Sequence, residues 1–104
     1  MSVTIREKNT GAALAQAEPG PDVLTYEGNL YFSPESVSKD SLTVTGRTYT
    51  CPSKGTCHWV DFSPSGGTTV KDVAWVYAEP KTGHEAIKGR YGFYAGSRGA
   101  TTQD

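Results

Sequence analysis

The fold is decided by residues 57–77, CHWVDFSPSGGTTVKDVAWVY, which contain the longest extended run in the chain. The first part, 57–62, and the last part, 68–77, are rich in Val, Thr and aromatic residues, which favour β-strands. The Ser, Pro and Gly residues at 63–67 between them predict a hairpin loop. In the second strand neither the odd nor the even positions are cleanly polar. We therefore expect a central strand that is covered on both faces.

Shorter strands are predicted on both sides of this hairpin. They are indicated by extended residue types between Gly, Pro, Asn and Asp residues, which favour turns. Segment 12–18 is ambiguous, because its alanines favour a helix but seven residues before Pro19 are too few for a stable one. The other expected short strands cover residues 3–6, 23–26, 30–32, 42–45 and 91–95.

Two short helical turns and one domain are expected. Ser, Pro and Glu at 33–35 supply a cap, a first-turn proline and a first-turn acid, but the residues that follow show no apolar stripe. A second turn is expected at 84–88. We predict a single all-β domain over residues 1–96. The C-terminal residues 97–104 have few apolar side chains to bury, so we expect them to form a flexible tail.

Composition and charge exclude several classes of protein. The net charge of −1 argues against a nucleic-acid partner, because proteins that bind nucleic acids usually carry a strong excess of positive charge. Leu, Ile, Val and Phe together number only 17, so the core must rely on aromatic and β-branched residues. No apolar stretch approaches the roughly 18–20 residues of a membrane span, and the first residues lack the apolar core of a secretion signal. We expect a cytoplasmic protein without a membrane or nucleic-acid partner.

The two cysteines, Cys51 and Cys57, do not form a recognisable metal site. Their spacing differs from that of zinc knuckles, and Cys57 and the adjacent His58 would point to opposite faces of a strand. A structural disulfide is not expected in a reducing cytosol. We therefore expect no metal and no cofactor. Cys51 lies three residues before Lys54, and a nearby ammonium lowers the pKa of a thiol. It is a candidate nucleophile, and the alternative is a buried thiol at a strand end.

Other residues are candidates for acid–base chemistry or for ligand binding. Glu79 lies between an aromatic strand and a proline turn, where partial burial would raise its pKa and suit acid–base chemistry. The alternative is a surface carboxylate. Asp72 is a second acidic side chain, and it is a candidate for ligand binding. Several aromatic side chains either build the core or line a pocket, since small-molecule sites need apolar walls with a few polar groups. These are Trp59, Trp75, Tyr77 and Tyr94.

Four segments follow one another in the order of a known set of motifs. Residues 26–37, YEGNLYFSPESV, resemble EGNxYFPPESV, and residues 50–56, TCPSKGT, resemble TxCPxKGxA. Residues 72–80, DVAWVYAEP, resemble DAAWxYxEP, and residues 87–94, IKGRYGFY, resemble IxGxVAFY. These motifs are those of a bacterial family of domains of unknown function, number 427, and the resemblance covers about residues 3–96.

The resemblance implies a small all-β domain of the β-tent type, with two antiparallel sheets. Methionine-R-sulfoxide reductases and the thalidomide-binding domain of cereblon share this fold and hold ligands in a cup between two sheets. The family reads NGxxxAES around 12–18, which implies a strand there. Some members are labelled nucleotidyltransferase-like, but this chain does not supply the paired acids that hold metal at phosphates. The motif positions are Cys51, Lys54, Asp72, Trp75, Tyr77, Glu79 and Tyr94.

This chain departs from the family pattern at two positions. Cys57 stands where the family usually has a small residue, and His58 where it has an aromatic one. Both departures argue further against a metal site, and they argue against a shared Cys51–Cys57 redox mechanism. Because proteins of one fold perform many functions, kinship with the sulfoxide reductases implies the fold alone.

Two functional hypotheses remain open. In the first, the domain binds a small anionic or planar molecule in an aromatic cup near Cys51, Lys54 and Glu79. Lys54 would then hold an anionic group, and Cys51 or Glu79 would perform any chemistry. In the second, the domain is a protein-interaction or homodimerisation module without ligand chemistry. Cys51 would then lie in the core, and Lys54 and Glu79 would pair across it.

Overall fold

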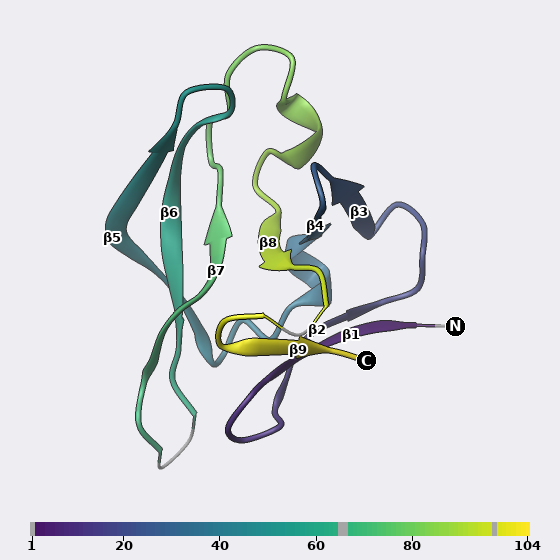
Figure 1. The fold of residues 1–104 in the computed structure, drawn as a ribbon, viewed down its shortest axis with the longest axis vertical. Helices are drawn as coiled ribbons and strands as arrows, with labels where there is room; N and C mark the ends of the chain where they lie inside the picture. Colours follow the sequence, from purple (N-terminus) through teal and green to yellow (C-terminus); the bar gives the residue numbers. More distant parts are fainter. Residues whose placement is uncertain (1, 65–66, 97) are drawn as a thin grey trace.

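The computed structural model of the chain describes residues 2–64, 67–96 and 98–104. It shows an all-β domain in which two antiparallel sheets are joined by loops and two short 3-10 turns (Figure 1). The predicted hairpin loop at 63–67 lies partly outside the described residues. In the described part of the chain, no helix has the length and apolar character needed to cross a membrane.

The larger sheet contains six strands in the order β3-β4-β8-β7-β6-β5, and each neighbouring pair is antiparallel. The extended segments predicted around the 63–67 loop are confirmed as β6 and β7. As predicted, β7 is a central strand, because it lies between β6 and β8, and its consecutive residues from Val73 to Val76 are buried, which requires cover on both faces. The strands are β3 Val23–Tyr26, β4 Asn29–Phe32, β5 Leu42–Cys51, β6 Gly55–Phe62, β7 Val70–Val76 and β8 Tyr91–Tyr94.

The smaller sheet has the order β2-β1-β9, and in Figure 1 its strands lie below β8 and run crosswise to the strands of the larger sheet. It is built from β1 Val3–Glu7, β2 Ala13–Ala17 and β9 Thr101–Gln103. Strand β2 confirms the strand that the family resemblance implied for the ambiguous alanine-rich segment. Pairing with β1 supplies the backbone partners that so short a segment needs to form ordered structure.

The C-terminal segment differs from the flexible tail expected over 97–104, because it contains β9. In the antiparallel ladder with β1, Gln103 stands opposite Ile5, and Thr101 is only 1 % exposed. Arg6 adds an ion pair with Asp104, at 2.6 Å between Nε and Oδ2. The segment has few apolar side chains to signal a strand. Its order comes from backbone pairing with residues near the other end of the chain, which local composition does not reveal.

The remaining elements are of the predicted type, but not all have the predicted length. The two helical turns are confirmed as η1, Pro34–Ser36, and η2, Glu85–Ile87. The strand expected at 42–45 continues through all of β5. A register irregularity between Val44 and Thr48, around Gly46, interrupts its pairing with β6. The glycine and the absence of an apolar alternation concealed this continuation.

Alternation along the larger sheet divides its side chains between two cores. On one face, residues such as Phe32, Val60 and Phe93 pack with Ile5 and Leu14 of the smaller sheet, and these side chains are fully buried. This is the main hydrophobic core. The opposite face carries a second, aromatic cluster of buried residues, namely Tyr31, Cys57, Trp75, Tyr77 and Ile87.

The aromatic cluster depends on a glycine that lets two large side chains meet across a strand. Gly92 of β8 stands opposite Trp75 of β7 and opposite Tyr31 of β4. A Cβ added to Gly92 would lie 2.4 Å from Trp75 Nε1 and 2.8 Å from Tyr31 Cε2. Because this space is free, Trp75 Nε1 donates a buried 3.1 Å hydrogen bond to the Tyr31 hydroxyl. The two rings meet edge to face at 6.2 Å.

The substitution Gly92→Ala tests this arrangement. The added methyl group overlaps the indole, so we expect the free energy of unfolding to fall by about 1–3 kcal/mol, the usual cost of overpacking. Urea denaturation measures the change. Gly46→Ala is the matched control, because Gly46 also lies within the larger sheet but has no neighbouring atom within 4 Å. The control should stay within about 0.5 kcal/mol of the unsubstituted protein. Equal stability of the two variants would contradict the arrangement.

Candidate functional site

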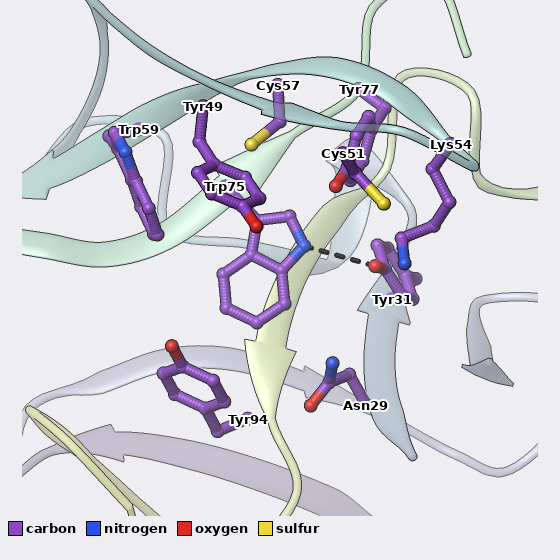
Figure 2. Close-up of a pocket in the computed structure, with 10 residues that line it drawn as sticks. All are labelled: Asn29, Tyr31, Tyr49, Cys51, Lys54, Cys57, Trp59, Trp75, Tyr77 and Tyr94. Atoms are coloured by element: carbon purple, nitrogen blue, oxygen red, sulfur yellow. Dashed lines mark hydrogen bonds between the residues drawn. The ribbon is translucent and has the colours of Figure 1, made fainter. Parts of the chain in front are cut away.

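The face of the larger sheet that turns away from the smaller sheet contains a cavity of about 200 Å³ (Figure 2). Alternate residues of β4, β5, β6, β7 and β8 point to this face, and the loops after β5 and β7 complete the lining. Proteins that share the β-tent fold hold ligands in a cup between two sheets. In this chain the pocket instead lies on one face of the larger sheet. Its lining residues are Asn29, Tyr31, Tyr49, Cys51, Lys54, Cys57, Trp59, Trp75, Tyr77 and Tyr94.

Trp75 stands at the centre of the aromatic wall of this pocket. Its indole meets the ring of Trp59 at 6.2 Å and an interplanar angle of 80°, and the ring of Tyr94 at 5.0 Å and 62°. Tyr49 continues the wall at 6.4 Å from Trp59. Edge-to-face contacts of this kind are favourable for aromatic pairs. The wall offers a rigid apolar surface against which a planar group can lie.

The polar end of the pocket is held by the tight hairpin between β5 and β6. Cys51 stands opposite Gly55 and closes the turn over 52–54. Gly55 has φ of 108°, a backbone conformation that favours glycine. Lys81 donates from its backbone to the Lys54 carbonyl at 2.8 Å and from Nζ to the Pro52 carbonyl at 2.9 Å. The loop after β7 thus fixes the turn.

The turn surrounds the sulfur of Cys51 with hydrogen-bond donors. The backbone N–H groups of Lys54 and Ser53, together with the Lys54 ammonium, lower the pKa of the Cys51 thiol below its ordinary value. Burial acts in the opposite direction but is outweighed, because Cys51 is only partly buried. A thiol with a lowered pKa is more often present as thiolate, which is the nucleophilic form.

Lys54 joins this hairpin to the hairpin between β3 and β4. Its Nζ lies 2.7 Å from Oε1 of Glu27, and its side chain is 16 % exposed. Glu27 has φ of 51° and is followed by Gly28 with φ of 83°, as a tight hairpin turn requires. The hydrogen bond between the two groups raises the pKa of Lys54 and lowers that of Glu27. Lys54 therefore stays charged, and its partner is Glu27 instead of the predicted Glu79.

The second thiol of the pocket is chemically different from the first. Cys57 is 2 % exposed, and burial raises the pKa of its thiol. It shares a hydrogen bond with the hydroxyl of Tyr77, whose pKa is also raised by burial. Burial raises the pKa of Tyr31 as well, so these three groups stay protonated near neutral pH. Of the two thiols, Cys51 is the one prepared to ionise.

The structure brings most of the predicted site residues together but leaves two outside. Asp72, on β7, forms an ion pair with Arg47 of β5, at 2.8 Å between Oδ1 and Nη2. Arg47 also pairs with Asp61, whose carboxylate accepts a 3.1 Å hydrogen bond from the Asp72 backbone nitrogen. These contacts brace three neighbouring strands. Glu79 is exposed in the loop after β7 and does not line the pocket. The predicted residues that do line it are Cys51, Lys54, Trp59, Trp75, Tyr77 and Tyr94.

Sequence reasoning missed several residues that line the pocket and, outside the lining, the carboxylate that pairs with Lys54. Tyr49 lies two positions before Cys51 on one strand, so alternation would have placed both on one face had β5 been recognised in full. Tyr31 lies in a strand that was predicted, but its partner Trp75 is 44 positions away. Glu27 meets Lys54 across 27 positions, and no local pattern predicts that contact. Asn29 was missed because nothing in its residue type or spacing indicates a role in binding or catalysis.

Two antiparallel sheets with an aromatic pocket that carries a thiol and a lysine define this chain as a small all-β domain with a candidate ligand site. Residues 3–104 match the family described as "Domain of unknown function (DUF427)", and the chain belongs to that family. The match covers nearly the whole chain and confirms the resemblance carried by the four motifs. No curated protein matches the chain.

The different surroundings of the two thiols predict how each reacts with iodoacetamide. Cys51 should be alkylated in the native protein, with a pH midpoint below the value of about 8.5 for a free thiol. Lys54→Met should raise that midpoint, because it removes the ammonium beside the sulfur. Cys57 should be labelled only after unfolding. Mass spectrometry locates the adducts over a series of pH values.

Lys8→Met is the control for this experiment, since Lys8 is exposed on the smaller sheet's turn and does not line the pocket. It should leave the midpoint unchanged. A Cys51 midpoint at or above that of a free thiol would show that the turn does not stabilise the thiolate.

Proposed function

We propose that the domain binds a small molecule that has a planar apolar body and an electronegative end. The body lies against the aromatic wall, and the end reaches Lys54. One observation carries the proposal: an ammonium and an ionisable thiol converge with an aromatic wall in a single cavity. Ligand sites in proteins combine apolar walls with a few polar groups in this way.

The dimensions of the pocket restrict the size of the ligand. Its volume of about 200 Å³ is below the range of about 300–1,000 Å³ usual for drug-sized ligands. One or two fused rings with a short polar substituent fit such a space. A nucleotide, with its base, sugar and phosphates, exceeds it. The proposal therefore favours a compact aromatic or conjugated compound.

The charge of Lys54 supports an electronegative end. An ammonium has three N–H donors, and one of them is used by Glu27. A second faces Cys51, whose hydrogen bond with this group helps to lower the thiol pKa. A ligand carboxylate or carbonyl oxygen can take the remaining donor. Because Lys54 is largely shielded from solvent, a hydrogen bond to it is less weakened by competition with water.

Homodimerisation through an edge strand has weaker support. Strand β5 forms one edge of the larger sheet and carries the exposed apolar residues Val44 and Tyr49. It also carries a register irregularity and the charged Arg47. Both features are devices that discourage a sheet edge from pairing with another chain. Tyr49 in addition lines the pocket, so its exposure is explained by the ligand hypothesis.

Titration with 2-naphthoate, followed by tryptophan fluorescence, tests the proposed function. The matched probe 2-naphthamide has the same planar body without the charge. We expect both to bind and the carboxylate to bind about tenfold more tightly, the gain expected from one charge-assisted hydrogen bond. Lys54→Met should remove the difference between the probes, whereas Trp59→Ala should weaken both.

Lys8→Met again serves as the charge-matched control and should leave both affinities unchanged. Isothermal titration calorimetry checks that the fluorescence change reports binding. Failure of both probes to bind would overturn the proposal. So would binding that neither Lys54→Met nor Trp59→Ala alters, because the probes would then occupy another surface.

A further inference from the structure

We propose that Cys51 is a nucleophile that adds covalently to conjugated carbonyl compounds, such as α,β-unsaturated ketones, bound in the aromatic pocket. The proposal rests on the proposed function, because the pocket must first hold the planar compound beside the sulfur. It goes further by assigning a bond-forming step to one named atom, Cys51 Sγ, and a chemical class to the ligand.

The two thiols are placed for single-thiol chemistry. Cys51 stands opposite Gly55, and Cys57 stands opposite Tyr49, so the cysteines are diagonal neighbours on adjacent strands. Diagonal neighbours in a sheet lie about 7–8 Å apart, whereas a disulfide requires Cα atoms within about 7 Å. Formation of a disulfide would therefore require movement of the hairpin. Cys57 is also buried and hydrogen-bonded to Tyr77, which leaves Cys51 to react alone.

The groups around the sulfur favour a carbonyl compound. Figure 2 shows the Cys51 sulfur, the Lys54 ammonium and the Tyr31 hydroxyl pointing toward one another at one end of the pocket. A fixed cation beside a nucleophile stabilises negative charge that develops on a nearby oxygen. The pairing of Lys54 with Glu27 holds that cation in place before a ligand arrives.

The residue types in the lining favour addition over hydrolysis or acyl transfer. Among the described residues that line the pocket, none is a histidine, an aspartate or a glutamate. Hydrolysis and acyl transfer usually require a general base or acid to handle water and the leaving group. Addition to a carbon–carbon double bond has no leaving group. It needs a thiolate, an activating cation and a planar site, which are the features this pocket has.

The step balances without a further reagent except a proton. The thiolate electron pair forms a carbon–sulfur bond at the β-carbon of the conjugated ketone, and the carbon–carbon π bond breaks. Its electrons move to the carbonyl oxygen as an enolate, which the Lys54 ammonium stabilises. The α-carbon then takes a proton from solvent to give the saturated thioether. No oxidation or reduction is involved, and loss of that proton reverses the reaction.

The test uses two ketones of matched size on the complete chain. Benzylideneacetone is conjugated and planar, whereas benzylacetone is its saturated analogue and cannot add a thiol. Intact mass spectrometry and peptide mapping should show one benzylideneacetone adduct, on Cys51. The rate should saturate with ketone concentration and exceed, by at least tenfold, the rate with glutathione at equal thiolate concentration. Cys51→Ser should abolish the adduct.

The Lys54→Met variant separates enolate stabilisation from thiol ionisation. The comparison is made at a pH above the Cys51 pKa of both proteins, including the raised pKa of the variant, so that the thiol is ionised in each; the maximal rate at saturating ketone excludes differences in binding. Under these conditions the variant should still react at least tenfold more slowly with benzylideneacetone. Its reaction with iodoacetamide, which forms no enolate, should be nearly unchanged. Lys8→Met should match the unsubstituted protein with both reagents.

Each failure has a distinct reading. If benzylacetone binds but benzylideneacetone forms no adduct, or reacts no faster than with glutathione, the nucleophile proposal is overturned and the proposed function stands. An adduct on Cys57 or Lys54 instead of Cys51 also overturns it. If neither benzylacetone nor 2-naphthoate binds, the proposed function fails. A benzylideneacetone rate that rises linearly with concentration then shows that Cys51 reacts without a binding site.

Discussion

The hydrogen bond from the Trp75 indole to the Tyr31 hydroxyl, 3.1 Å long and laid across Gly92, sets the position of the rest of the pocket. It links β7 to β4 over the strand between them, and a larger residue at position 92 would collide with both rings. The indole fixed in this way supports the neighbouring rings of Trp59 and Tyr94. The opposite face of the same strands packs on the smaller sheet, so the wall stands on the main core of the domain. Rigid support of this kind lets a small protein keep an open aromatic surface.

The second constraint is the meeting of two hairpin tips at the end of that wall. Glu27 of one tip fixes Lys54 of the other, and Lys54 together with the turn amides stabilises a thiolate at Cys51. The Glu27 carboxylate outside the lining therefore contacts the Lys54 ammonium, and the ammonium in turn acts on the Cys51 sulfur inside the pocket. The sheet supplies the apolar surface and the turns supply the chemistry. This division is common, because loops held on a rigid scaffold can carry reactive groups without disturbing a core.

The sequence predicted the parts of the structure that depend on local pattern. Alternation placed Trp75 in a central strand, and the motifs singled out Cys51 and Lys54, all of which the pocket brings together. The C-terminal strand β9 was missed because its order comes from pairing with β1. Glu27 was missed because its role depends on a contact with a distant hairpin. Asp72 was expected in the site from its residue type and its motif position, yet its ion pair with Arg47 is decided by strand register. Local pattern thus predicted the strands, and tertiary pairing decided which polar groups meet.

We propose that the pocket on this face of the larger sheet receives a small planar molecule. The most direct measurement is a two-dimensional proton–nitrogen NMR spectrum of the labelled protein, recorded while 2-naphthoate is added. We expect saturable shifts of the indole N–H signals of Trp59 and Trp75 and of the backbone N–H of Lys54, with the signals of β1, β2 and β9 unchanged. Shifts confined to the smaller sheet, or indole signals that do not move while the probe binds, would contradict it.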